Sequence, residues 1–194
     1  MIKKEKAPCV CLVITNFRGN SKILKDLLLS ISRQTYPLNK ICIIIVNCFF
    51  NCTKFLDQLR KDKALAAVLP RIETIDMKVD KGLPHMRNTA IKLILDRYNE
   101  CEFIFFLDND VKLHPKCIEE LVNEAEEDTE ACVFQPAVFF WSKDKLPQSF
   151  GFLVDSLGFE HLLLPYDECI YKFVQKLREQ YHDCLLYTSP SPRD

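Results

Sequence analysis

Hydrophobic and polar positions follow a regular rhythm along the chain, in which short apolar runs are separated by segments of helical periodicity. The centres of five such runs lie about 30 residues apart, which is the size of one βαβ unit. The runs predict strands at Val10–Thr15, Ile41–Asn47, Arg71–Asp76, Phe103–Leu107 and Ala131–Gln135. The second run is continuously apolar, which is typical of a strand buried on both faces.

Between these runs, apolar residues recur with the 3.6-residue period of a helix. The stripes are Ile23–Ile31, Met86–Arg97 and Ile118–Ala125, with a weaker one at Leu56–Lys63. Pro115 suits the first turn of the third helix, and His114 is expected to cap it. The alternation predicts an α/β fold with a mostly parallel central sheet flanked by helices.

The rhythm changes after residue 136. Alternating segments and two glycines in Ser149–Leu164 predict a hairpin or an irregular antiparallel pair, and Tyr171–Tyr181 has a helical pattern. The final stretch, Cys184–Asp194, continues no pattern and resembles translated adapter sequence. We therefore expect residues 1–183 to form a partial domain that is incomplete at its C-terminus, and residues 184–194 to be a non-native tail. The alternative is a disordered Ser/Pro-rich terminus.

Composition excludes several classes of protein. The chain has 26 basic and 27 acidic residues and a net charge of −1, which gives no electrostatic basis for binding nucleic acid. No run approaches the roughly 18 apolar residues of a membrane-spanning helix. The four glycines form neither a dinucleotide fingerprint, nor a P-loop, nor a hydrolase nucleophile elbow.

The ten cysteines include no C-x-x-C pair, which argues against a zinc site. Four of them, Cys11, Cys42, Cys101 and Cys132, fall within apolar runs, where we expect the thiol to pack as a small hydrophobic group. The N-terminal segment lacks the features of a signal peptide, so we expect a protein of the reducing cytoplasm.

One acidic motif stands out as candidate chemistry. The apolar run Phe103–Leu107, which we expect to be a central strand, is followed by Asp108-Asn109-Asp110. Ligands of open α/β sheets bind beyond the carboxyl ends of the strands, so both carboxylates would reach that crevice. Two carboxylates spaced in this way suit Mg²⁺ or Mn²⁺ that also binds phosphate oxygens. By itself the motif is equally consistent with a polar turn.

Four motifs, in order, resemble the family-two glycosyltransferases, and in particular their rhamnosyltransferase-like members. They are residues 12–19 with the helix ending at 30–37, residues 82–91, the Asp108–Asp110 motif with His114-Pro115, and Gln135-Pro136 with residues 151–158. The resemblance extends from residue 8 to about residue 183. It implies a GT-A fold, and it implies inverting transfer of a hexose from a nucleotide diphosphate to an acceptor hydroxyl. It also implies a Mn²⁺ or Mg²⁺ ion at the Asp-x-Asp (DXD) motif.

The same resemblance implies roles for individual residues. Asp110 would be the direct metal ligand, and Asp108 would hold the ribose or a metal-bound water. Asn47 stands where the family commonly has an aspartate that contacts the base. The implied nucleotide-sugar-binding residues are Thr15, Asn16, Asn47, Arg87 and Asp108. The inverting mechanism needs a carboxylate base. In the family this base lies in a later motif, so no catalytic base is assigned here.

The acceptor implied by the resemblance is a saccharide, a lipid-linked group or a protein, in cell-envelope polysaccharide biosynthesis. The expected location is the cytoplasm or the inner face of the membrane, and no span is expected in this chain. Two alternatives stay open. One is a non-catalytic nucleotide-binding module of the same fold. The other is a nucleotidyltransferase, which needs a glycine-rich phosphate loop where residues 18–22 supply a single glycine.

Overall fold

The structure is a computed structural model that describes residues 7–129, 131–140, 147–149, 152–154, 160–162 and 185–188. Side chains are described in residues 7–129 and 131–139. The chain divides into two compact units, Met1–Val111 and Lys112–Asp194. The candidate site residues from Thr15 to Asp110 all belong to the first unit.

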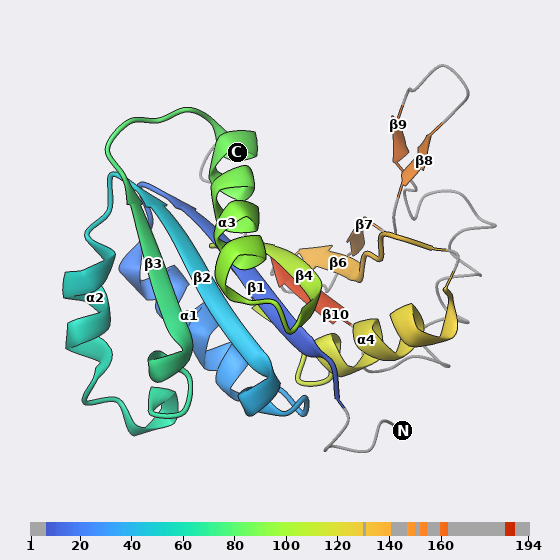
Figure 1. The fold of residues 1–194 in the computed structure, drawn as a ribbon, viewed down its shortest axis with the longest axis horizontal. Coiled ribbons are helices and arrows are strands. Elements are labelled where there is room, and N and C mark those ends of the chain that lie inside the picture. Colours follow the sequence, from blue (N-terminus) through green and yellow to red (C-terminus); the bar gives the residue numbers. More distant parts are fainter. Residues whose placement is uncertain are drawn as a thin grey trace. The chain divides into compact units, whose positions relative to one another are not determined.

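The first unit is built on a four-stranded parallel sheet (Figure 1). Its strands are β1 (Cys9–Phe17), β2 (Ile41–Cys48), β3 (Ile72–Met77) and β4 (Cys101–Asp108), in the order β3-β2-β1-β4. All three neighbouring pairs are parallel. The predicted α/β class, the parallel sheet and the first four predicted strands are therefore confirmed.

Helices connect these strands, as parallel neighbours require. They are α1 (Ser21–Ser32), α2 (Cys52–Leu59) and α3 (Leu83–Arg97), with 3₁₀ turns at Leu38–Lys40, Lys63–Leu65 and Leu69–Arg71. Figure 1 shows α3 crossing one face of the sheet and α1 lying on the opposite face. The connections therefore place a layer of helix on each side of the strands, which explains the continuously apolar sequence of β2.

Successive residues of a strand point to opposite faces of the sheet, so β1 and β2 contribute side chains to two hydrophobic layers. The α3 face contains Cys11, Val13, Ile44, Val46, Cys48, Met86, Ala90 and Ile94, all buried. Leu12 and Ile14 alternate with the β1 members of that layer and are fully buried, as are Leu24, Leu27 and Leu28 of α1. Complete burial of each large aliphatic side chain contributes roughly 1.5–3 kcal/mol.

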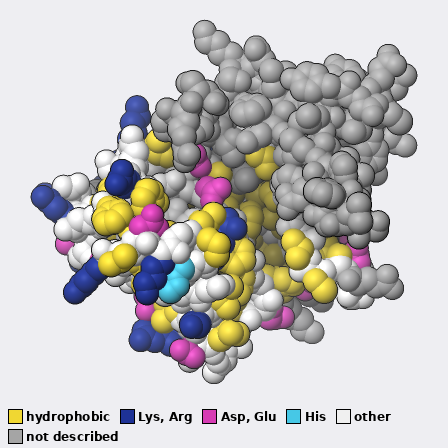
Figure 2. All heavy atoms as spheres, turned by 90° about the horizontal axis from the view of Figure 1, so that it is seen from above, with side chains coloured by type: hydrophobic (Ala, Val, Ile, Leu, Met, Phe, Trp, Pro, Cys, Tyr) yellow, Lys and Arg dark blue, Asp and Glu magenta, His cyan; other side chains and the backbone are white. Residues whose placement is uncertain are grey.

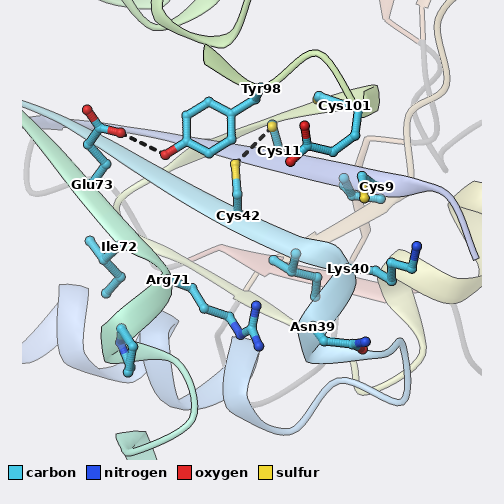
Figure 3. A pocket seen from close by; sticks show the side chains of 14 residues that line it. Cys9, Cys11, Asn39, Lys40, Cys42, Arg71, Ile72, Glu73, Tyr98 and Cys101 are labelled. Atoms are coloured by element: carbon cyan, nitrogen blue, oxygen red, sulfur yellow. Dashed lines mark hydrogen bonds between the residues drawn. The ribbon is translucent and has the colours of Figure 1, made fainter.

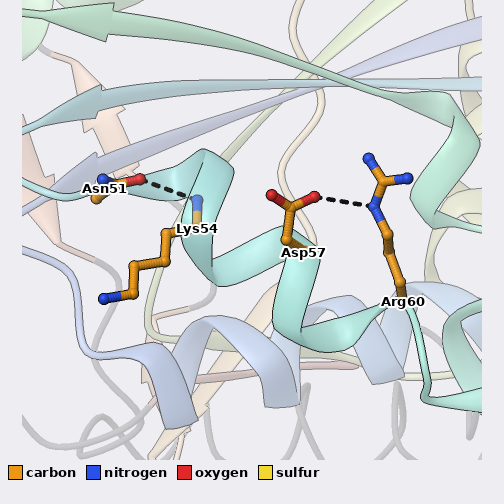
Figure 4. A network of polar contacts seen from close by, with 4 residues as sticks. All are labelled: Asn51, Lys54, Asp57 and Arg60. Carbon is orange, nitrogen blue, oxygen red and sulfur yellow. Dashed lines mark hydrogen bonds and ion pairs between the residues drawn. The ribbon is translucent and has the colours of Figure 1, made fainter.

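Polar caps fix where two of the helices begin. The Asn20 Oδ1 accepts a hydrogen bond from the Lys22 amide at 2.9 Å, and α1 starts there. In α2 the Asn51 Oδ1 accepts from the Lys54 amide at 2.9 Å (Figure 4). The predicted helix at 56–63 is shorter in the structure, because α2 ends at Leu59 and Lys63 belongs to a separate turn capped by Asp62.

The entry to α3 depends on a glycine. Gly82 has φ 83° and ψ 164°, a conformation that is essentially confined to glycine, and its amide donates to Asp80 Oδ1 at 2.8 Å. Pro84 occupies the first turn of the helix, where its missing N–H costs nothing. This turn aims α3 back across the sheet towards β4.

The expectation that the Phe103–Leu107 strand is central is wrong for the sheet of the first unit, where β4 lies at the edge. The chain builds β1, β2 and β3 outwards in one direction, and α3 then returns it to the other side of β1. Ile104 and Phe106 of β4 are 36% and 37% exposed. The apolar sequence of β4 therefore did not by itself predict the place of this strand in the sheet.

The second unit contains α4 (Cys117–Glu127) and short strands. A sheet has the order β5-β10-β6-β7, with β5 at Val111–Leu113, β6 at Ala137–Phe140, β7 at Pro147–Ser149 and β10 at Leu185–Thr188. A separate antiparallel pair joins β8 (Phe152–Val154) to β9 (Glu160–Leu162). The predicted hairpin within residues 149–164 is thus confirmed.

Two predictions in this unit are wrong. Residues 131–135 form no strand, and β6 begins only at Ala137, directly after a proline that lacks a backbone donor. Helix α4 begins at Cys117, so Pro115 precedes its first turn, and the His114 Nδ1 accepts from the Lys116 amide at 3.4 Å.

Other expectations are not decided. The predicted helix at 171–181 lies outside the described residues. Strand β10 falls within the predicted tail, whose origin stays a prediction. Among the described residues, no helix combines the length and apolar character that crossing a bilayer requires.

Candidate functional site

The candidate site lies at the carboxyl ends of β1, β2 and β4. From β1 the chain proceeds to β2 on one side, while β4 pairs with β1 on the other side, so the topology switches between β1 and β4. Open α/β sheets bind their ligands at such a switch point. Register places Thr15 opposite Asp108, and Asn16 opposite Asn47. The fold thus brings residues that are far apart in the sequence together at the carboxyl ends of these strands.

Three asparagine side chains form a hydrogen-bonded chain beneath this edge. The Asn109 Nδ2 donates to Asn16 Oδ1 at 2.7 Å, and the Asn16 Nδ2 donates to Asn47 Oδ1 at 2.9 Å. The Asn47 Nδ2 in turn donates to the Ile45 carbonyl at 3.3 Å. Asn109 is the middle residue of the acidic motif, so this chain ties the motif to β1 and β2.

Burial limits what the two inner asparagines can contact. Asn16 is 0% exposed and Asn47 is 1% exposed, and both amides are engaged within the protein. In this arrangement neither side chain presents an atom to a ligand, so a base would contact Asn47 only after the amide chain rearranged. Their part in nucleotide binding stays a prediction, and the geometry favours an indirect one.

The backbone is unusual just after β1 and β2. Arg18 and Phe49 have φ of 47° and 59°, although neither is a glycine, and such residues concentrate at functional sites. The Arg18 amide donates to the Cys48 carbonyl at 2.9 Å, which links the two strand ends. The Arg18 guanidinium carbon lies 5.4 Å and 5.7 Å from the ring centres of Phe17 and Phe49. Phe17 is 44% exposed and Phe49 is 56% exposed.

Arg87 approaches the acidic motif from α3. Its Nη2 lies 3.7 Å from Asp108 Oδ1, and its guanidinium carbon lies 5.4 Å from the centre of the Phe106 ring. The Arg87 Nε is buried without a hydrogen-bond partner. Both side chains of the ion pair are substantially exposed, so the pair contributes little to stability and leaves the guanidinium available to an anion.

The surroundings of Asp110 disfavour the negatively charged form of its carboxyl group. Partial burial, and secondarily the negative charge of Asp108, raise the pKa of the Asp110 carboxyl above its usual value. A cation beside the two carboxylates would offset both effects. In the part of the chain that the structure describes, no three His, Cys, Asp or Glu side chains gather as a metal cluster. Any cation here would therefore need further oxygen ligands from a substrate or water.

A cavity of about 730 Å³ lies beyond the ends of β2 and β3. Its lining includes Phe49, Lys54, Asp76 and Lys78. In the view of Figure 2, Lys and Arg side chains are scattered over the described surface among acidic and hydrophobic ones. The cavity therefore offers an aromatic ring and two cations close to the strand ends, without a broad basic surface.

Comparison with known proteins agrees with this architecture. Residues 11–163 match the family described as glycosyl transferase family 2. This chain belongs to that family. The parallel sheet with helices on both faces is its GT-A fold, so the fold and the family implied by the sequence motifs are both confirmed. Among curated proteins, no sequence matches the chain.

Solved structures show the same fold at low sequence identity. The crystal structure of S. aureus TarS is 19% identical with a TM-score of 0.50, and the match covers 73% of this chain and 23% of that one. A mannosyltransferase from Pyrobaculum calidifontis, in complex with GDP-Man and Mn²⁺, is 16% identical with a TM-score of 0.48. That match covers 72% of this chain and 37% of the mannosyltransferase. The chain thus spans only a minor part of the length of these proteins.

The structure brings the predicted residues to one edge, and it adds others that the sequence motifs did not single out. Asn109 was visible only as the spacer between two aspartates, and Gly19 only as part of the first motif. A Cβ on Gly19 would lie 1.8 Å from Asn16 Oδ1, so this glycine packs directly on the amide chain. The available signal was the recurrence of asparagine at the carboxyl ends of three strands, at positions 16, 47 and 109.

Proposed function

We propose that this site binds a nucleotide-diphosphate sugar and that the protein to which it belongs transfers the sugar to an acceptor hydroxyl with inversion. Membership of glycosyl transferase family 2 supports the reaction class. The observation that carries the proposal is the pair of carboxylates, Asp108 and Asp110, delivered with Arg87 to the switch point of a parallel sheet.

The acidic pair fits a divalent cation. Mg²⁺ or Mn²⁺ is commonly held by one or two carboxylates together with phosphate oxygens, which agrees with two acidic residues and no complete cluster among the described side chains. Asp110 would be the direct ligand and Asp108 the second acidic group. When bound, such a cation neutralises charge on the departing nucleotide diphosphate.

The chain's own residues would position the donor. Arg87 can turn its guanidinium from Asp108 to a phosphate, with which it forms charge-assisted hydrogen bonds. Thr15 lies opposite Asp108 in the register and is 7% exposed, and it would line the nucleotide site at the carboxyl end of β1. Asn16, Asn47 and Asn109 would keep the strand ends in register beneath the ligand.

No described residue is assigned as the catalytic base. Inversion requires a carboxylate that removes the acceptor proton. We infer that this group lies outside the part of the glycosyltransferase that this chain represents, because the chain covers only 23% to 37% of the matched structures. The acceptor would be a saccharide, lipid-linked or protein hydroxyl, and cell-envelope polysaccharide synthesis is its expected setting.

The test is calorimetric titration of the chain with UDP, with and without Mn²⁺. We expect binding that requires Mn²⁺ and that Asp110→Ala abolishes, with little change in the unfolding free energy, because removing one of two like charges relieves repulsion. If UDP does not bind, the titration is repeated with GDP and with dTDP. Asp96→Ala, an exposed aspartate of α3, is the matched control and should bind as wild type.

Two outcomes would contradict the proposal in different ways. Unchanged Mn²⁺-dependent binding by Asp110→Ala would remove the metal assignment. Binding of no nucleotide by a folded chain would leave the donor site unsupported. Nucleotide binding without sugar transfer would agree with a catalytic base outside this chain, and also with the alternative of a non-catalytic nucleotide-binding module. A longer protein containing the missing motif would distinguish these two.

A further inference from the structure

A second cavity opens at the opposite end of the sheet, where the four strands begin. It has a volume of about 520 Å³ and is lined by residues at the starts of β1, β2, β3 and β4. Four thiols lie along it: Cys9, Cys11, Cys42 and Cys101 (Figure 3). None of the residues proposed to bind the donor lines this cavity, so its thiols need an explanation of their own.

Cys11 and Cys42 are placed as a disulfide would require. They are register partners on the neighbouring strands β1 and β2, and their Sγ atoms lie 2.9 Å apart. Neighbouring strands are about 4.7–4.9 Å apart, which falls within the Cα separation of about 4.4–6.8 Å found in disulfides. Both side chains lie on the face covered by α3, so no strand needs to rotate for the sulfurs to meet.

The two thiols differ in access. Cys11 is buried, with 2% of its surface exposed, whereas Cys42 is half-buried and lines the cavity. A small oxidant entering the cavity would therefore reach Cys42 first, and Cys11 would be the partner that attacks from behind. Figure 3 shows the contact between their sulfurs under Tyr98, whose hydroxyl donates to Glu73 Oε2 at 2.7 Å.

Cys101 completes the group as a third thiol from β4. Hydrogen bonding with Cys101 and Cys42 raises the pKa of Cys11 above its usual value. The bond from Cys11 lowers the pKa of Cys101. The Cys101 thiol donates to the Phe103 carbonyl at 3.2 Å, so its proton is already engaged by the β4 backbone.

We propose that Cys11 and Cys42 are a redox-active dithiol, which hydrogen peroxide converts to a cross-strand disulfide. In the first step the Cys42 thiolate attacks one peroxide oxygen and the O–O bond breaks. This gives the sulfenic acid of Cys42 and hydroxide. The hydroxide takes up the proton lost by the Cys42 thiol and becomes water.

In the second step the Cys11 sulfur attacks the sulfenic sulfur of Cys42 and loses its proton. The S–O bond breaks, and the leaving hydroxide takes up the proton of Cys11 and becomes water. Overall, two thiols and one hydrogen peroxide give one disulfide and two waters, with both cysteines oxidised and the peroxide reduced. Such reversible disulfides in a reducing compartment are typically redox-sensing.

The experiment treats the full chain, reduced beforehand, with hydrogen peroxide, blocks the remaining thiols by alkylation and maps the linked peptides by mass spectrometry. We expect one major linkage, Cys11–Cys42, which dithiothreitol reverses. Cys42→Ser should abolish this linkage, because no sulfenic acid can then form at the position that Cys11 attacks. Cys9→Ser is the matched control, because Cys9 lines the same cavity two residues from Cys11, and it should retain the linkage.

Cys101→Ser is a second control, because it removes another thiol of the same cavity, and it should retain the Cys11–Cys42 linkage. Circular dichroism establishes that each variant is folded, and Cys11→Ala replaces Cys11→Ser if the buried hydroxyl prevents folding. Irreversible oxidation of Cys42 without linkage, or a major linkage between other cysteines, would overturn the proposal. The proposal would also be overturned if peroxide still removed two free thiols from the Cys42→Ser variant.

Discussion

Asn47 is a buried polar residue whose importance depends on its neighbours. Its Oδ1 is the acceptor for the Asn16 Nδ2, in a region where neither side chain is exposed. Asn47→Leu removes that acceptor and leaves a buried donor unsatisfied, which costs about 1–3 kcal/mol of unfolding free energy. Urea denaturation followed by circular dichroism measures the loss.

The control for this variant is Asn39→Leu, at an exposed asparagine of the first unit. Surface substitutions of this kind usually change stability by no more than about 0.5 kcal/mol. Equal losses in the two variants would mean that the amide chain contributes nothing specific. A larger loss at Asn47, together with weaker Mn²⁺-dependent nucleotide binding, is the expected result.

Gly19 tests the same amide chain by steric means. A Cβ at this position would lie 1.8 Å from Asn16 Oδ1, and the Asn16 amide cannot turn away because it is hydrogen-bonded on both sides. Gly19→Ala should therefore destabilise the protein by about 1–3 kcal/mol, as overpacking of a tight site does. Denaturant unfolding again gives the value.

A double-mutant cycle distinguishes this clash from a general effect on the loop. Asn16→Ala removes the oxygen that the new methyl group would meet, so Gly19→Ala should cost less in that background. Coupled residues in contact show interaction energies of about 0.5–3 kcal/mol. Strict additivity of the two substitutions would show that Gly19 is not constrained by Asn16.

At this scale, the sequence predicted which residues reach the site better than it predicted what they do there. Ordered motifs identified Asp108, Asp110 and Arg87, because each motif is local. The amide chain joins residues 31 and 93 positions apart, and the choice of partner depends on strand register. No local pattern encodes that choice, so the burial of Asn16 and Asn47 became visible only in the folded chain.

Helix α3 is the element that carries Arg87 to the acidic motif. Its buried residues Met86, Ala90 and Ile94 pack in one layer with β1 and β2. Ile94→Ala removes a 2% exposed side chain from that layer and should cost about 2–5 kcal/mol of unfolding free energy. Leu95→Ala changes the next residue, which is 69% exposed, and should change stability by less than about 0.5 kcal/mol.

Both substitutions keep helix propensity high, so the comparison isolates burial on one face of α3. Thermal or urea unfolding of the two variants provides the measurement. Similar losses would mean that α3 is not anchored through this stripe. The expected difference would establish that the stripe fixes the helix and therefore the approach of Arg87 to Asp108.

The elements of the first unit were largely predictable because the signals that define them are local. The first four of the five predicted strands match β1–β4 within two residues at each end, and two of the helical stripes match α1 and α3. Strand order was not predictable in the same way. The apolar β4 suggested a central strand, but its place at the edge follows from the crossover of α3, which composition does not record.

On the scale of the whole molecule, the proposed donor site and the single tryptophan fall in different units. Every residue proposed to bind the nucleotide or the metal belongs to Met1–Val111, whereas Trp141 belongs to Lys112–Asp194. The far-ultraviolet circular dichroism includes the parallel sheet and helices of the first unit. Tryptophan fluorescence comes only from Trp141, which falls in the sequence range of the second unit. Circular dichroism and Trp141 fluorescence therefore give two different signals of unfolding.

A ligand stabilises the folded state that binds it, by about 2.7 kcal/mol when its concentration is 100 times the dissociation constant. We expect UDP with Mn²⁺ to raise the melting midpoint seen by circular dichroism and to move the Trp141 fluorescence midpoint less, because the site lies within the first unit. UDP or Mn²⁺ alone should shift neither midpoint as far, and Asp110→Ala should cancel the combined shift. Equal displacement of both midpoints would show that the units unfold cooperatively. A combined shift that persists in Asp110→Ala would instead mean that the nucleotide and the cation bind elsewhere.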